Sequence, residues 1–258
     1  MRIVVLMKVV PDTWVERTLS LETGLAVRTP EDAVLDEINE RALEVALAYA
    51  DEAPETTVTV VAMAPKSVQS ALRKAVAMGA HDAVQIIDDR LVGADLILTA
   101  RVLAAASQHL GFDLIVAGDS STDGGGGGVP VAIAETLGIA AATHLTQVEL
   151  NEDSLTGVRA SDAAAMHVTA DLPAIISITE ALPDARLPNF KGILAAKKKE
   201  IIELTLDQLG IDADPGAAPA TIMIGARERP PREAGTTIVD EGDAGAQLAA
   251  FLVENRLA

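Results

Sequence analysis

Short apolar runs alternate with amphipathic stretches through the first half of the chain. Four runs are almost wholly apolar, which is typical of strands buried on both faces of a parallel sheet. They predict strands at residues 3–7, 57–62, 83–87 and 114–117. Between them, apolar residues recur every three or four positions, the period of a helix with one buried face. This spacing predicts helices over residues 35–49, 67–78 and 95–110, and Gly79 and Gly111 follow the last two as C-terminal caps.

This alternation predicts an α/β fold, a doubly wound, mostly parallel sheet with helices on both faces. From residue 144 the pattern changes to runs that look antiparallel, and we expect them to extend one edge of the same sheet. These runs are residues 144–150, 155–160, 166–169 and 174–178.

The chain divides, on this reading, into a domain over residues 1–211 and a C-terminal arm over residues 212–258. Four prolines lie between residues 212 and 235, a composition that suits an extended arm. A short amphipathic helix with Leu248, Phe251 and Leu252 follows at 243–257. A helix at the end of an arm usually needs a partner chain to bury its apolar side, so we expect one.

Composition narrows the function classes. The formal charge of −18 argues against a nucleic-acid partner, because phosphate backbones are bound by clustered Lys and Arg. The sequence has no cysteine, which excludes thiolate metal sites and Cys nucleophiles. The five-residue apolar run before Lys8 is too short for a signal peptide or a membrane span, so we expect a cytoplasmic protein.

Residues 118–130, GDSSTDGGGGGVP, follow a predicted strand and open a helical pattern. Five consecutive glycines let backbone N–H groups approach an anion without interference from a Cβ, and Pro130 suits the first turn of a helix. Because a helix N-terminus carries partial positive charge, the stretch predicts a phosphate-binding loop. A flexible surface loop is the alternative. No Lys follows as in a P-loop, and the dinucleotide fingerprint matches only because the glycines are consecutive.

Acid–base, nucleophilic or metal-dependent catalysis finds little support in the sequence. The four histidines are scattered without metal-ligand spacing, and there is no G-x-S-x-G motif.

Five stretches, in order along the chain, resemble segments of the electron transfer flavoprotein beta subunit family. The first is residues 7–13, MKVVPDT, where a strand ends in a Lys-x-x-Pro-Asp-Thr turn. The others are residues 35–42, 77–80, 121–124 and 190–199. The resemblance covers essentially the whole chain, including the arm.

The resemblance implies an electron carrier rather than an enzyme. In this family the beta subunit pairs with an alpha subunit that holds most of an FAD, and the beta subunit itself binds a structural AMP. The heterodimer takes electrons from acyl-CoA dehydrogenases and similar flavoenzymes to a membrane quinone oxidoreductase. Two alternatives remain, a stand-alone adenine-nucleotide-binding regulatory module and an NADH-using bifurcating variant.

The resemblance also places the binding residues. Apolar Leu6, Val34 and Met63 would sandwich an adenine and backbone N–H groups of residues 124–129 would take the phosphate, although core packing also explains Leu6 and Met63. Thr13 would lie near the isoalloxazine of the partner's FAD. The full AMP site would comprise Leu6, Ala33, Val34, Leu35, Asp36, Met63, Ser121, Thr122, Asp123, Gly124, Gly125, Gly126, Gly127, Gly128, Val129, Pro130, Val131 and Ala132.

The family's partner-recognition loop corresponds to residues 184–199. Register on the lysine cluster at 197–199 places Phe190 as the apolar anchor, with Leu187 nearby. Arg186 and Lys197 would also contact the dehydrogenase. The alternative is that Phe190 packs on its own domain.

Overall fold

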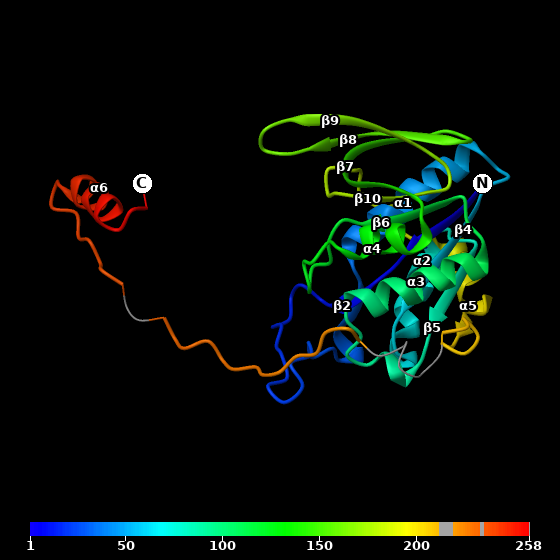
Figure 1. Cartoon of the computed structure of the whole chain (residues 1–258), viewed down its shortest axis with the longest axis horizontal. Helices are drawn as coiled ribbons and strands as arrows, with labels where there is room; N and C mark the ends of the chain where they lie inside the picture. The colour runs from blue at the N-terminus through cyan, green and yellow to red at the C-terminus, as the bar shows by residue number, and fades with distance from the viewer. Residues whose placement is uncertain (212–218, 233–234, 258) are drawn as a thin grey trace. The chain divides into compact units, whose positions relative to one another are not determined.

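The structure, a computed structural model, describes residues 1–211, 219–232 and 235–257 (Figure 1). The chain forms two compact units, Met1–Gly225 and Ala226–Ala258, which are described separately. The start of the predicted arm, with Pro215, lies outside the described residues.

Within the described residues, nine strands form one sheet in the order β11-β5-β4-β1-β6-β10-β7-β8-β9. In this order, each strand from β11 across to β7 runs parallel to its neighbours. Strands β7, β8 and β9 form an antiparallel extension at one edge, as predicted (Figure 1). The strands are β1 (Arg2–Leu6), β4 (Thr57–Met63), β5 (Asp82–Ile86), β6 (Leu114–Gly118), β7 (Ala140–Leu150), β8 (Ser154–Ala160), β9 (Ala165–Asp171), β10 (Ala174–Ile178) and β11 (Ile202–Leu204). The α/β, doubly wound fold class is therefore confirmed.

The antiparallel prediction for residues 174–178 was wrong. Strand β10 lies between β6 and β7 and runs parallel to both. All five of its residues are buried, and four of them are apolar, which is the signature of a central parallel strand. The chain returns from the edge hairpin into the sheet at this strand.

Helices cover both faces of the sheet. Along β1, Ile3 and Val5 pack toward α1 and α2. Val4 and Leu6 pack toward α3 and α4 on the other face. One strand therefore contributes side chains to two hydrophobic cores. Gly79 and Gly111 follow α2 and α3 with positive φ, as expected of C-terminal caps. The helices of this unit are α1 (Glu37–Glu52), α2 (Gln69–Met78), α3 (Leu96–Leu110), α4 (Val129–Leu137) and α5 (Phe190–Lys198).

The helix predicted from residue 35 begins two residues later than expected. Residues Ala33–Leu35 form the short strand β3, which pairs with β2 (Val9–Pro11) in a separate two-stranded ribbon. Asp36 is the residue immediately before α1. The ribbon therefore sets where the start of α1 lies relative to the end of β1.

The second unit contains one helix, α6 (Ala244–Glu254), among its described residues. Leu248, Phe251 and Val253 are exposed, and none of the helix is buried. In the described part of the chain, no helix combines the length and the apolar character that a membrane crossing requires.

Candidate functional site

Strands β1, β4 and β6 end at the same edge of the sheet, and the glycine loop begins there. Because β1 pairs in parallel with both neighbours, Leu6, Met63 and Gly118 lie at adjacent strand ends. Leu6 is buried, and Met63 is half-buried against the core under α3 and α4. Val34, on the ribbon, is exposed. Apolar side chains therefore lie at the carboxyl ends of the strands, where doubly wound sheets bind ligands.

Asp36 links the start of α1 to the glycine loop. Its Oδ2 accepts the N–H of Thr122 at 2.9 Å, and its own N–H donates to the carbonyl of Lys8 at 3.0 Å. Burial raises the pKa of this carboxyl, the Thr122 N–H opposes that rise, and the negative charge of Asp123 adds to it. Its Oδ1 is buried and has no hydrogen-bond partner within the described residues. Asp36 thus positions the loop rather than presenting a charge to solvent.

Asp123 is held by two cations. Lys8 Nζ lies 2.7 Å from its Oδ1, and Arg28 donates to its Oδ2 from Nη2 at 2.6 Å and from Nε at 3.1 Å. Burial raises the pKa of Asp123, but the hydrogen bonds and charges of Lys8 and Arg28 outweigh it and hold the pKa well below its usual range. Lys8 Nζ also donates to Ser121 Oγ at 2.9 Å. The side chains of Ser121 and Asp123 therefore bind Lys8 and Arg28 and hold the loop in place.

Lys8 and Arg28 hold Asp123 in the loop, and neither was predicted from the sequence as a site residue. Lys8 lies in the quoted MKVVPDT motif, so a signal existed, but the motif does not show its partner 115 residues away. Arg28 lies in an irregular segment with no motif. Arg17, from the same segment, donates to the carbonyl of Thr122.

The glycine loop leaves several backbone donors free. Gly124 and Gly125 donate to Oγ and O of Ser121, whereas the N–H groups of residues 126–129 have no acceptor in the part of the chain that the structure describes. Gly125 and Gly127 both have a φ of +62°, which favours glycine. Pro130 occupies the first turn of α4, and Val131 and Ala132 follow it in the helix. These free N–H groups at the start of α4 suit an anion.

His144 lies beside this loop, although no role for it was predicted from the sequence. Its Nδ1 is 3.6 Å from Oδ2 of Asp119, and its backbone φ is +57°. The only sequence signal was its place near a predicted strand start.

Known proteins resemble this chain over most of its length. The electron transfer flavoprotein domain model matches residues 23–209. The electron transfer flavoprotein subunit beta of Mycobacterium tuberculosis is 44% identical over 99% of this chain and 98% of its own length. The proteins of the same name from Bacillus subtilis and Megasphaera elsdenii are 32% and 28% identical, over 93% and 100% of this chain and 93% and 98% of their own lengths. This chain belongs to the electron transfer flavoprotein beta subunit family. The predicted resemblance is confirmed.

In the predicted recognition loop, the apolar residues Leu187 and Phe190 are exposed. Leu187 and Phe190 are 87% and 77% exposed, so Phe190 does not pack into its own domain. Arg186 instead faces inward, because its guanidinium pairs with Glu44 at 2.8 Å and with Asp51 at 2.9 Å. Lys197 is exposed.

Asn189 and Gly192 set the start and the position of α5, the helix within this loop. Asn189 Oδ1 accepts the N–H of Gly192 and caps α5, and a Cβ at Gly192 would collide with the carbonyl of Ala77 in α2. The close approach of α5 to α2 therefore sets the direction in which Phe190 projects.

Thr13 lies in an irregular excursion that follows β2. Thr13 and Trp14 are exposed, and Asp12 holds the turn by accepting the N–H of Trp14 at 3.0 Å. The excursion is joined to the glycine loop through Arg17 and Arg28. Thr13 thus stands on a segment tied to the candidate nucleotide site.

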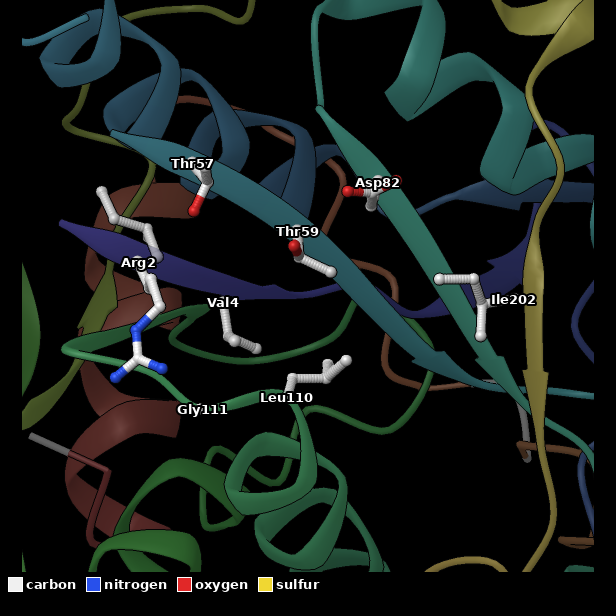
Figure 2. Close-up of a pocket in the computed structure, with 9 residues that line it drawn as sticks. Arg2, Val4, Thr57, Thr59, Asp82, Leu110, Gly111 and Ile202 are labelled. Atoms are coloured by element: carbon white, nitrogen blue, oxygen red, sulfur yellow. The ribbon is translucent and has the colours of Figure 1, made fainter. Parts of the chain in front are cut away.

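A cavity of about 220 Å³ lies at the opposite, amino ends of the strands, near Arg2, Thr59 and Leu110 (Figure 2). None of the predicted site residues lines it. Its charged groups already have partners, because Arg2 pairs with Asp113 and Asp82 pairs with Lys199. This cavity therefore offers a ligand no free charge. Among the described residues, no group of three or more His, Asp or Glu side chains is placed to hold a metal ion.

Proposed function

We propose that this chain is the beta subunit of a heterodimeric electron transfer flavoprotein. It pairs with an alpha subunit that holds most of an FAD, and it carries electrons from acyl-CoA dehydrogenases or similar flavoenzymes to a membrane quinone oxidoreductase. Family membership supports the carrier role. The flavin supplies the redox chemistry when bound, and this chain supplies position and electrostatics.

Structural AMP binding in the glycine loop is the second part of the proposal. The observation that carries it is the row of free N–H groups at residues 126–129, in the loop between β6 and α4. These donors take the phosphate, and Val34 and Met63 contact the adenine. Leu6 is buried. Ser121, Asp123 and Asp36 act by holding the loop in place.

The arm over residues 212–258 grips the alpha subunit in this account. Support comes from α6, whose apolar residues Leu248 and Phe251 are exposed within their own unit. An exposed apolar helix on an arm is stabilised when a partner chain buries it. Thr13, on the exposed excursion, faces the partner's flavin.

Segment 184–199 docks the electron donor, with Phe190 as its anchor. Its exposed Leu187, Phe190 and Ile193 are the apolar part of this surface, and Lys197 and Lys198 add positive charge. Arg186 holds the segment on its own domain through Glu44. Aromatic anchors that enter pockets often dominate the binding energy of such interfaces.

Co-expression with the alpha subunit, followed by analysis of bound nucleotide and flavin, tests the proposal. We expect a yellow heterodimer with one AMP and one FAD. A colourless monomer that exchanges ATP would favour the stand-alone regulatory module instead.

A further inference from the structure

His144 adopts a backbone conformation that side chains rarely take. Its φ of +57° lies in the left-handed region, and among the described residues the only other such residue that is not glycine is Arg256 near the C-terminus. Non-glycine residues in this region store strain, which is retained where the surrounding structure fixes it and often where function needs it. The position of His144 therefore calls for a physical reason.

A β-bulge causes this conformation. Between the pairs Ile176–Ala142 and Ile178–Leu145, β7 has two residues where β10 has one. The extra residue is accommodated because the N–H of His144 donates to Ser177 Oγ at 2.9 Å instead of to a strand carbonyl. Bulges re-aim side chains and are common next to active sites.

The bulge aims the imidazole at the glycine loop. Its Cε1, which lies between the two ring nitrogens, is 3.6 Å from where a Cβ on Gly127 would stand. Nδ1 faces Oδ2 of Asp119 at 3.6 Å, while Oδ1 of Asp119 accepts the N–H of Ser120. No partner of the other nitrogen, Nε2, is found within the described residues, and the side chain is half exposed.

The neighbours of His144 favour an anion at Nε2. Asp119 lies on one side of the ring and faces Nδ1, which leaves Nε2 free to face the glycine loop. The free N–H groups of Gly127 and Gly128 lie on the glycine-loop side. On the neighbouring strand β8, Arg159 is engaged with Thr143, donating to its carbonyl at 2.7 Å and to its hydroxyl at 3.2 Å.

We propose that His144 contacts the phosphate of the bound nucleotide and selects nucleoside monophosphates over nucleosides. This inference rests on the proposed AMP site. The imidazole donates from Nε2 to a phosphate oxygen that the loop N–H groups also hold, while Nδ1 faces Asp119. It acts alongside the backbone donors of the glycine loop.

His144→Asn tests this role with little disturbance of the backbone, since asparagine tolerates the left-handed region better than most residues. His144→Gly, which relaxes the strain completely, serves as a second variant. His167→Asn, on exposed strand β9, is the matched control. Each full-length chain is co-expressed with the alpha subunit, freed of nucleotide, and titrated with AMP and with adenosine.

We expect both His144 variants to bind AMP about tenfold more weakly, as loss of a hydrogen bond to a charged group predicts, and to bind adenosine like wild type. The control should bind both ligands like wild type. In addition, inorganic phosphate should shift the imidazole NMR signals that disappear in His144→Asn. Equal losses of AMP and adenosine affinity would show a structural role and overturn the proposal, as would unchanged AMP affinity.

The AMP site itself has a separate test outcome. If wild type binds no AMP, the nucleotide site is wrong and the role of His144 falls with it. If wild type binds AMP and both variants match it, only the role of His144 is overturned.

Discussion

Lys8 Nζ and Asp123 Oδ1 lie 2.7 Å apart and join the end of the first strand to the glycine loop. The carboxylate is almost completely buried between Lys8 and Arg28, whose side chains remain partly exposed. One ion-pair cluster therefore connects three segments that are far apart in the sequence. The conformation of the proposed phosphate-binding loop depends on it.

Asp123→Asn should destabilise the protein by about 1–2 kcal/mol at pH 7, because it leaves Lys8 and Arg28 without their shared carboxylate. The folded-state pKa of Asp123 is depressed. Its contribution is therefore fully present above the unfolded-state pKa of about 3.9 and is lost as the pH falls through the folded-state pKa. Urea unfolding of both proteins should show a stability gap at pH 7 that narrows below about pH 4.

Asp207→Asn is the control, because Asp207 is an exposed partner of Arg90. Exposed pairs contribute about 0–1 kcal/mol, so this variant should stay close to wild type. A gap between Asp123→Asn and wild type that stays constant down to pH 3 would contradict the ion-pair account.

Gly126→Val and Gly127→Val should distinguish two effects of a side chain in the loop. One is obstruction of the ligand, and the other is strain in the backbone. Gly126 has open space around it, whereas Gly127 has a positive φ and a Cβ there would stand 3.1 Å from the carbonyl of Asp119. We expect both variants to lose AMP, measured by chromatography of released nucleotide, and only Gly127→Val to melt at a lower temperature.

Gly225→Val is the matched control, since a Cβ added at Gly225 would meet nothing within 4 Å and Gly225 lies outside the loop. It should keep a full equivalent of AMP. Full AMP content in both loop variants would show that residues 126–129 do not bind the phosphate.

Truncation after Arg232 should weaken the heterodimer. The deletion removes α6 and with it the exposed Leu248 and Phe251. Size exclusion at concentrations near the dissociation constant should then show free alpha subunit or loss of its FAD. An unchanged heterodimer under these conditions would mean that the arm does not grip the partner.

Phe190→Ala should weaken the complex with an acyl-CoA dehydrogenase about 30-fold or more, since a buried aromatic anchor contributes roughly 2–4 kcal/mol. AMP and flavin content should not change. Donor-dependent reduction rates at subsaturating concentrations measure the effect.

Val92→Ala, at another exposed apolar position, should leave these rates unaltered. If Phe190→Ala also reacts at the wild-type rate, the anchor is a different residue. Leu187, which is 87% exposed, is then the next to replace.

The sequence predicted the elements whose periodicity is strong and local. Helices α2 and α3 and strands β1, β4 and β6 lie within a few residues of their expected bounds. Strand β10 was misassigned because its pairing partners lie far away in sequence, and an apolar run alone does not show strand direction. Leu35 was placed in a helix because the ribbon of β2 and β3 depends on a contact between separate segments.

The location of the site could be predicted from the sequence, but the contacts between its side chains could not. The glycine run and Pro130 indicated a loop at the start of a helix, because local residues determine both. The pairing of Asp123 with Lys8 and Arg28 depends on tertiary structure, as does the aim of His144, which a bulge between distant strands produces. No local pattern carries that information.

Anaerobic mixing of the flavin-containing heterodimer with a substrate-reduced acyl-CoA dehydrogenase tests electron carriage most directly. The account predicts that the absorbance of the heterodimer's flavin falls, and that it recovers when the membrane quinone oxidoreductase is added. Reduction by NADH but not by the dehydrogenase would favour the bifurcating variant. A flavin that no dehydrogenase reduces, in a heterodimer of full FAD content, would contradict the proposed function.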